Sequence, residues 1–279
     1  MRTLLLSLVV TSLVSYVLLT FAISSDAVID PNTAAGIWSF DKGDAKDSSK
    51  KGLNGNIVGG VKSVKGVVGK ALQFDGKKGG IKIPDSADIN TGGPYTDRTI
   101  VAFFNCDDVD IDSRKQTIYE EGGRTRGLVL YVFDGEVYVG GWNRAEYNWN
   151  GAWPSAPVKS NKWYHVGLVI RNAKGKVEKD KFEMWLNGDL IAKESGGQLH
   201  AHGDDIGIGH VNQNTVFHDE DGSGSDIHWF GGMIDEVAVY NSAFDEADFR
   251  QLAKPVRSVE PEAKFAITWG AIKAQWVVR

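Results

Sequence analysis

Apolar and polar residues alternate along short segments of the chain from residue 36 onward, and glycine, asparagine and aspartate separate the segments. Phe182, Met184 and Leu186, for example, fall on one side of an extended chain, as a strand with one buried face requires. The segments that predict strands are 36–40, 56–61, 71–74, 80–83, 98–104, 116–120, 127–133, 136–142, 163–171, 181–188, 190–194, 205–211 and 227–240. More than ten strands in succession, with no helix between them, predict an all-β sandwich of two antiparallel sheets.

Two of the predicted hairpins carry a turn signal of their own. Asp134 and Gly135 stand between the apolar segments 127–133 and 136–142, and "LNGDLIA" places an Asn-Gly pair between two further segments. A two-residue hairpin turn of type I′ needs positive φ at both central residues, which these pairs adopt most readily. The strands on either side of each pair are therefore expected to be hydrogen-bonded neighbours.

One short helix is predicted near the end of the strand pattern, over residues 242–253. Ser242 can cap its first turn, acidic residues follow, and Phe249 and Leu252 form an apolar stripe on one side. After this helix, two prolines and alternating charges indicate a linker over residues 254–264.

The chain divides into three regions. Residues 1–27 hold Arg2 and then an apolar run to about Ile23, the layout of a secretory signal peptide that is either cleaved or retained as a membrane anchor. Residues 28–254 form the predicted sandwich domain, and residues 255–279 form a linker with an apolar tail. We expect the protein to be secreted or extracytoplasmic, or tethered to the membrane by its N-terminal segment.

Composition narrows the class of function. The net charge is -5 and no long basic run is present, so nucleic-acid binding has no electrostatic support. Cys106 is the one cysteine of the sequence, which excludes a disulfide framework or a cysteine zinc site within the chain. The 33 glycines, nine tryptophans and twelve phenylalanines are typical of strands joined by tight turns.

Four motifs stand in a characteristic order: "GKALQFDG", "WYHVGLVIR", "FEMWLNGDLIA" and "FGGMIDEVAVY". Together they resemble the LamG-like jellyroll domains of the concanavalin A-like lectin/glucanase superfamily, over about residues 36–253. The resemblance implies a jellyroll of two antiparallel sheets with one short C-terminal helix. It says less about function, because this fold carries both binding modules and enzymes.

The resemblance also implies a structural calcium ion that ties the N-terminal segment to the last strand. The matching positions are Asp41, Asp47, Asn54 and Asp235. Strand alternation places Asp235 on the same side as Met233, Val237 and Val239, where a carboxylate needs a cation or backbone amides as partners. The alternative is that Asp235 accepts backbone hydrogen bonds and the N-terminal acids lie in exposed turns.

The segment "GWNRAEYNWNGAWP", residues 141–154, interleaves aromatic residues with amides and charges, which predicts a sugar-binding loop. Aromatic faces can stack on the apolar side of a sugar ring while polar groups bond its hydroxyls, as in binding sites that pair apolar surface with a few polar groups. Trp142, at the end of a strand, is expected in the core. The predicted ligand-binding residues are Arg144, Tyr147, Asn148, Trp149 and Trp153.

Two acidic segments raise other possibilities. Glu178, Asp180 and Glu183 have the E-x-D-x-x-E spacing of laminarinase-type glycoside hydrolases, but lysines surround the first two, which indicates a charged hairpin connection. The stretch "HDEDGSGSD", residues 218–226, reads as a solvated connection between strands. Alternatively, its alternating aspartates form a second calcium loop.

The sequence therefore predicts a non-catalytic binding module that recognises a carbohydrate or a cell-surface protein at its loop rims, with calcium as the one expected cofactor. A membrane partner is expected only if the N-terminal segment is not cleaved. A glycoside hydrolase or polysaccharide lyase of the same superfamily, or an adhesion or structural module, remains the alternative.

Overall fold

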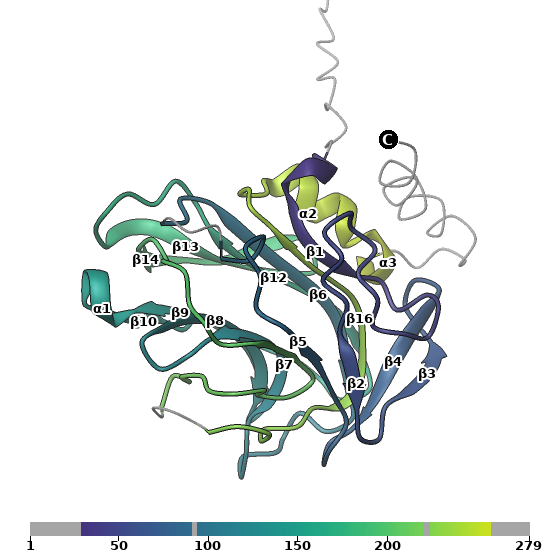
Figure 1. Cartoon of the computed structure of the whole chain (residues 1–279). Helices are drawn as coiled ribbons and strands as arrows, with labels where there is room; N and C mark the ends of the chain where they lie inside the picture. The colour runs from purple at the N-terminus through teal and green to yellow at the C-terminus, as the bar shows by residue number, and fades with distance from the viewer. Residues whose placement is uncertain (1–28, 91–93, 220–223, 258–279) are drawn as a thin grey trace, which may run out of the picture.

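The computed structural model describes residues 29–90, 94–219 and 224–257, which form two antiparallel sheets packed face to face (Figure 1). The first sheet contains β1 (Ala34–Trp38), β3 (Lys62–Lys65), β4 (Lys70–Asp75), β6 (Arg98–Cys106), β12 (Trp163–Ile170), β13 (Glu178–Leu186), β14 (Asp189–Gly196) and β16 (Gly231–Tyr240). The second contains β2 (Asn56–Val58), β5 (Gly80–Ile83), β7 (Gln116–Gly122), β8 (Arg126–Phe133), β9 (Glu136–Asn143), β10 (Trp149–Ala152), β11 (Ser155–Pro157) and β15 (Ile206–Ile208). The predicted all-β sandwich is confirmed.

Strand order alternates between near and distant segments, as crossovers between the two sheets require. The first sheet runs β14-β13-β12-β6-β16-β4-β3 with β1 beside β16, and the second runs β10-β9-β8-β7-β15-β5-β2 with β11 beside β9. Both predicted hairpins are present. Asp134 and Gly135 (φ 47° and 79°) turn β8 into β9, and Asn187 and Gly188 (φ 52° and 86°) turn β13 into β14.

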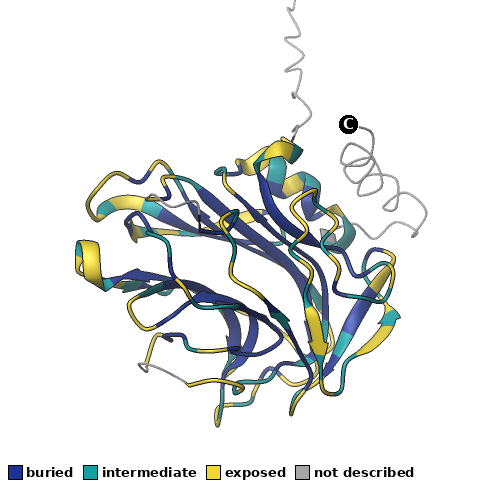
Figure 2. Ribbon diagram, in the orientation of Figure 1, coloured by how far each residue is buried: buried dark blue, intermediate teal, exposed yellow. Residues whose placement is uncertain are grey.

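The main hydrophobic core lies between the two sheets. Trp38, Phe104, Leu130, Val166 and Met184 are each at most 1% exposed and belong to one packed cluster of residues from both sheets. Figure 2 shows the buried residues following the strands through the middle of the sandwich. This core fixes the separation of the sheets and leaves their outer faces to be covered by other segments.

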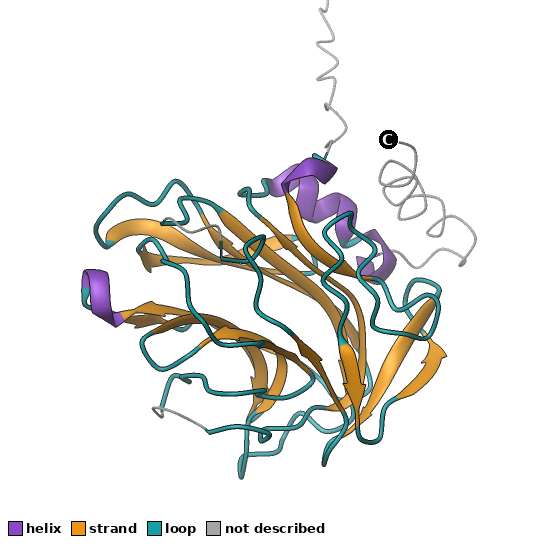
Figure 3. Cartoon of the chain, in the orientation of Figure 1, coloured by secondary structure: helices purple, strands orange, loops and turns teal. Residues whose placement is uncertain are grey.

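Helices cover the outer face of the first sheet (Figure 3). α2 (Glu246–Leu252) packs its Phe249 flat against Trp185, with ring centroids 4.5 Å apart. The prediction that Ser242 caps this helix is wrong. Asp245 is the cap and forms a capping box with Asp248, because the chain before it is still held in an extended connection.

The structure describes the first four residues of the predicted linker, 254–257. Lys254–Arg257 forms a further helical turn, α3, that packs near α2. The rest of the predicted linker, the apolar tail and the N-terminal signal or anchor segment lie outside the described residues. None of the helices in the described part of the chain is long and apolar enough to cross a membrane.

The outer face of the second sheet is covered by the described residues 209–219 and 224–230 of the connection between β15 and β16, here called loop 209–230, which lie beneath β7–β9 in Figure 1. A separate cluster forms here, which we call the outer cluster. It consists of Val129, Tyr131, Trp142, Val211, Val216 and Phe217. Strands supply the first three residues and the loop supplies the others, so the loop is packed down on the sheet.

A β-bulge in β16 changes the predicted side of Asp235. Glu236 has φ 49°, and the register with β6 shifts between Asp235 and Ala238. Because the bulge adds one residue to the strand, Val237 and Val239 face the core between the sheets while Asp235 does not. The prediction that Asp235 shares a face with these valines is therefore wrong, although Asp235 is fully buried.

Candidate functional site

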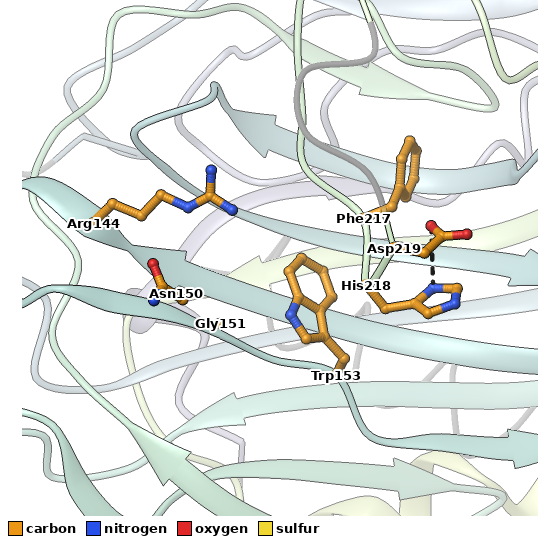
Figure 4. A pocket seen from close by; sticks show the side chains of 7 residues that line it. All are labelled: Arg144, Asn150, Gly151, Trp153, Phe217, His218 and Asp219. Carbon is orange, nitrogen blue, oxygen red and sulfur yellow. Dashed lines mark ion pairs between the residues drawn. The ribbon is translucent and has the colours of Figure 1, made fainter.

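A pocket of about 390 Å³ opens over the outer face of the second sheet, and two segments far apart in the chain form it (Figure 4). One segment follows β9 and includes α1 (Arg144–Tyr147) and β10. The other is the part of loop 209–230 that packs on the outer cluster. The lining residues are Arg144, Asn150, Gly151, Trp153, Phe217, His218 and Asp219.

The half-buried Trp153 forms the aromatic surface of the pocket. Its ring is stacked on that of Trp142, with centroids 5.7 Å apart and planes inclined by 20°. A Cβ atom on Gly140 or Gly151 would overlap the Trp153 ring, so both positions leave room for the indole. The glycines let the ring lie flat over β9 and β10.

Trp142 makes this surface rigid from below. It is fully buried, its Nε1–H donates to the carbonyl oxygen of Gly123 at 2.9 Å, and its ring occupies the place that a side chain at Gly127 would take. A buried indole whose N–H is bonded has one favoured orientation. Trp153 therefore rests on a fixed support.

His218 forms part of the opposite wall and is held by two tyrosines of the second sheet. Its Nδ1 is hydrogen-bonded to the hydroxyl of Tyr131 at 2.7 Å. Its ring stacks on Tyr138 at 4.6 Å with an interplanar angle of 7°, and Tyr138 stacks in turn on Tyr131. The wall of the pocket is thus part of an ordered aromatic stack.

Asp219, beside His218, carries the negative charge of the pocket. Lys115 Nζ lies 2.8 Å from Asp219 Oδ1 and 2.9 Å from Oδ2. Burial raises the pKa of Asp219, but the hydrogen bond and charge of Lys115, with a further contribution from His218, outweigh burial and leave the pKa below its ordinary value. The carboxylate is therefore ionised at neutral pH and accepts hydrogen bonds.

The structure places two of the predicted sugar-binding residues, Arg144 and Trp153, in the pocket. Trp149 is only 4% exposed and packs edge-on against Phe182 in the main core. The exposed Asn148 ends α1 in the left-handed conformation, with φ 50°, and is not among the lining residues. Trp149 and Asn148 therefore shape the loop that carries Arg144 and Trp153, and they do not line the pocket themselves.

Tyr147 also lies outside the pocket lining. Its hydroxyl donates to Gln198 Oε1 at 2.9 Å and is hydrogen-bonded to His200 Nε2 at 3.1 Å. These bonds tie α1 to the segment that follows β14. Tyr147 thus anchors the loop from the side away from Trp153.

The sequence did not point to the loop residues Phe217, His218 and Asp219 as part of this site. His218 and Asp219 open the stretch that reads as a solvated connection, yet both pack against the sheet. Asp226, at its other end, pairs with Lys82 at 2.7 Å. The sequence does contain one signal that this segment packs against the protein. Val216 and Phe217 stand directly before the acid-rich stretch, and two apolar residues are unexpected in a fully solvated loop.

The predicted calcium ligands fall into two groups. Val68 N–H donates to Asp235 Oδ2 at 3.1 Å and Lys70 N–H to Asp41 Oδ1 at 3.3 Å, so both carboxylates face the turn between β3 and β4. These oxygens and the carbonyls of such a turn are ligands that calcium accepts. In the described residues, no three histidine, cysteine, aspartate or glutamate side chains form a group that could hold a metal ion.

Asp47 and Asn54, the other two predicted ligands, brace their own loop. Asp47 Oδ1 accepts from the backbone N–H groups of Ile37 and Ser49, and Oδ2 accepts from the Ser49 hydroxyl and Leu53 N–H, all within 2.9 Å. Asn54 Oδ1 accepts from Asp47 N–H at 3.1 Å. This bonding ties the loop to β1.

Glu183, the last acid of the E-x-D-x-x-E spacing, is fully buried in β13 and not part of a charged turn. Its two carboxylate oxygens each accept from the Arg171 guanidinium at 2.8 Å, and Trp185 Nε1–H and Lys193 Nζ lie at 3.0 Å and 3.1 Å. Because four N–H groups enclose the carboxylate, Glu183 and Arg171 form a structural ion pair. It has no free face for a substrate.

The model of the family Laminin_G_3, described as the concanavalin A-like lectin/glucanases superfamily, matches residues 75–249, more than half of the chain. The chain belongs to this superfamily. The resemblance expected from the four motifs is confirmed, and the superfamily's name covers both lectins and glucanases. Comparison with curated proteins gives no match.

Solved structures similar to this superfamily member include several binding domains. Domain 4 of AbnA, an extracellular GH43 arabinanase from Geobacillus stearothermophilus, in complex with arabinotriose, is 17% identical at a TM-score of 0.58, over 80% of this chain and 98% of that one. The binding domain of Paraclostridial Mosquitocidal Protein 1 is 16% identical (TM-score 0.61, coverage 80% and 52%). The binding domain of botulinum neurotoxin DC, in complex with SialylT, is 12% identical (0.59, 82% and 52%).

At these identities the likeness establishes the fold. The chain spans about half the length of the toxin domains. A ligand that binds a toxin domain therefore does not mark a binding site on the half that this chain shares with it. The arabinanase domain is matched over almost its whole length. The two toxin domains are binding domains and the arabinanase domain is in complex with arabinotriose, whereas the superfamily as a whole also contains enzymes.

Proposed function

We propose that this protein is a non-catalytic glycan-binding module and that the pocket over the outer face of the second sheet receives the sugar. The observation that carries the proposal is the half-buried Trp153, stacked on a fixed Trp142 and surrounded by the polar side chains of Arg144, Asn150 and Asp219. A flat aromatic surface can stack against the apolar face of a sugar ring, and the polar groups can bond its hydroxyls.

Two further observations support binding and not catalysis. Two of the solved neighbours are binding domains of toxins, and a third, domain 4 of an extracellular arabinanase, is in complex with an oligosaccharide. Glu183 is enclosed by Arg171, Trp185 and Lys193. A retaining glycosidase needs two carboxyl groups about 5–5.5 Å apart that face a common cleft, and a fully buried, bonded Glu183 does not suit that role.

The proposal includes a structural calcium ion and an extracytoplasmic location. Asp41 and Asp235 would hold the ion against the turn between β3 and β4, where it would offset the charge of the buried Asp235. The signal-like segment and the extracellular origin of the arabinanase domain support a secreted or membrane-tethered protein. A cell-surface partner would then be recognised through its glycans.

A glycan array probed with wild type, Trp153→Ala and Trp163→Ala tests the proposal. Trp163 is a matched control, because it is also half-buried but packs on the outer face of the first sheet. We expect wild type and Trp163→Ala to retain the same oligosaccharides and Trp153→Ala to lose them. Equal retention by wild type and Trp153→Ala, with the fold intact, would contradict the proposed site.

A further inference from the structure

We propose that Asp219 selects sugars with two free adjacent hydroxyl groups and that Lys115, which does not touch the sugar, positions the Asp219 carboxylate. The inference rests on the proposed function and deepens it. It assigns to the pocket a specificity-determining acceptor on the wall beside Trp153. It also assigns a positioning residue outside the lining of the pocket.

Lys115 is built into the protein as an internal cation. Its side chain is 7% exposed, and Nζ lies 4.4 Å from the centroid of Phe133 and 5.7 Å from that of Phe217. The aromatic faces stabilise the ammonium group and shield it from the pocket. In the pocket a ligand meets the Asp219 carboxylate, whose side chain is 41% exposed, and not the buried ammonium group of Lys115.

The backbone of Lys115 fixes the same loop at a second point. Lys115 N–H donates to His228 Nδ1 at 3.2 Å, and Thr117 N–H donates to the carbonyl oxygen of His228 at 3.0 Å. Loop 209–230 is thus attached to the start of β7 through His228 and through Asp219. This double attachment holds the Asp219 carboxylate at one place on the pocket wall.

The bonding capacity of Asp219 leads to the hydroxyl pair. An ionised carboxylate offers about four lone-pair sites over its two oxygens and donates nothing. Lys115 Nζ approaches both oxygens, at 2.8 Å and 2.9 Å, and leaves each oxygen with further acceptor capacity on its exposed side. Two adjacent sugar hydroxyls are donors with a spacing that can match the two oxygens of one carboxylate, as in other bidentate contacts.

The position of Asp219 relative to Trp153 completes the arrangement. In Figure 4, His218 and Asp219 lie on one side of the Trp153 ring, and Arg144 and Asn150 lie on the other. A sugar ring stacked on Trp153 would present the hydroxyls of one edge toward Asp219. Methylation of those hydroxyls removes the two O–H donors and leaves two ether oxygens of the sugar facing the Asp219 carboxylate. This contact is unfavourable because oxygen acceptors on both sides stay unpaired.

The test uses immobilised arabinotriose, xylotriose, cellotriose and galactotriose, each also as its per-O-methyl derivative. The proteins are wild type, Asp219→Asn, Lys115→Met, Lys115→Arg, the double variant D219N/K115M and the pocket control Trp153→Ala. Thermal unfolding of every variant is measured in parallel. Lys115→Met removes the charge at similar length, whereas Lys115→Arg keeps a cation that can bind a carboxylate and lie on the aromatic faces.

We expect wild type to bind at least one free trisaccharide and not its methyl derivative. Asp219→Asn and Lys115→Met should each weaken binding by about tenfold, the loss typical of a hydrogen bond to a charged group. The double variant should lose no more than Asp219→Asn alone, because Lys115 acts through Asp219. Lys115→Arg should restore binding to within about threefold of wild type.

Each other outcome counts against a specific step. If Trp153→Ala abolishes binding while Asp219→Asn binds like wild type, the pocket stands and the selection by Asp219 is overturned. If the losses of Asp219→Asn and Lys115→Met add in the double variant, or if Lys115→Arg fails to restore binding in a folded protein, the positioning role of Lys115 is overturned. If wild type binds none of the free trisaccharides, the proposed function falls for these sugars, and this inference with it.

Discussion

Replacing Glu183 by glutamine tests whether the buried acid of the hydrolase-like spacing is structural. The substitution keeps the size of the side chain and removes its charge. Arg171 then loses the carboxylate that two of its hydrogen bonds reach at 2.8 Å, and Trp185 and Lys193 lose their common partner. We expect a large loss of stability, because one member of a buried ion pair is left without its counter-charge.

The magnitude follows from the exposure of the two partners. Removing one partner of a buried ion pair costs about 3–5 kcal/mol. The Glu183 side chain is 0% exposed but that of Arg171 is 32% exposed, so water can hydrate the guanidinium in the variant, and the lower end applies. A loss of about 3 kcal/mol lowers the unfolding temperature of a domain of this size by roughly 6–12 °C.

The stabilisation that the Glu183 carboxylate provides should also depend on pH. Burial raises the pKa of Glu183, but the hydrogen bonds from Arg171, Trp185 and Lys193 and the charge of Arg171 outweigh burial, so the pKa lies below its ordinary value of 4.5. A carboxyl with a lowered pKa stabilises the folded state above its ordinary pKa, and the stabilisation is lost as the pH falls through the folded-state pKa. The difference between wild type and Glu183→Gln should therefore be full at pH 7 and shrink in acid.

The assay is urea unfolding of wild type, Glu183→Gln and Lys193→Met at pH 7 and at pH 3. Lys193 is the control, because its side chain is 42% exposed and its removal leaves Glu183 bonded to Arg171 and Trp185, so Lys193→Met should cost less than Glu183→Gln. A loss below about 1 kcal/mol in Glu183→Gln at pH 7 would refute the reasoning from burial. Hydrolysis of a polysaccharide by wild type that disappears in a folded Glu183→Gln would instead make Glu183 catalytic.

Three further predictions concern the core, a buried acid and the proposed calcium ion. Trp149→Ala should cost about 3–5 kcal/mol in urea unfolding, as for a large core side chain, so a folded variant with wild-type stability would contradict its burial. Burial raises the pKa of Glu120 well above 4.5, so the contribution of Glu120 to the free energy of unfolding should fall as the pH rises above about 4.5. Glu120→Gln should remove this decline, and a variant with the same pH dependence of stability as wild type would contradict the prediction. Calcium at about a hundred times its Kd should stabilise wild type by about 2.7 kcal/mol over protein in chelator, and Asp235→Asn should abolish the difference; equal unfolding temperatures of wild type in both buffers would exclude the ion.

The strands and hairpins could be predicted because each rests on a local signal. Alternation fixes which side of a strand is buried, and the pairs Asp134–Gly135 and Asn187–Gly188 supply the positive φ angles that their turns need. The bulge at Glu236 has no such signal. A single inserted residue in the left-handed conformation reverses the sides of the residues after it, so the predicted side of Asp235 was wrong.

The pocket could be predicted only in part, because it depends on contacts between distant segments. Trp149 and Trp153 lie in the same loop with the same chemistry, and the sequence favours neither. The register of β10 on β9, with a shift between Trp149 and Ala152, sends Trp149 into the core, while Gly140 and Gly151 leave room for Trp153 outside. Asp219 arrives from another loop, held by Lys115, and this long-range pairing has no signature in the local sequence.

The most direct test of the central claim is a titration followed by NMR of the tryptophan indole N–H groups. The ligand is the trisaccharide that wild type retains most strongly among arabinotriose, xylotriose, cellotriose and galactotriose, and the resonances are assigned with single Trp→Phe variants. We predict that the Trp153 Nε1–H resonance shifts in a saturable way while that of Trp163 stays in place. Saturable binding that shifts Trp163 and leaves Trp153 unmoved would contradict a sugar site over the outer face of the second sheet.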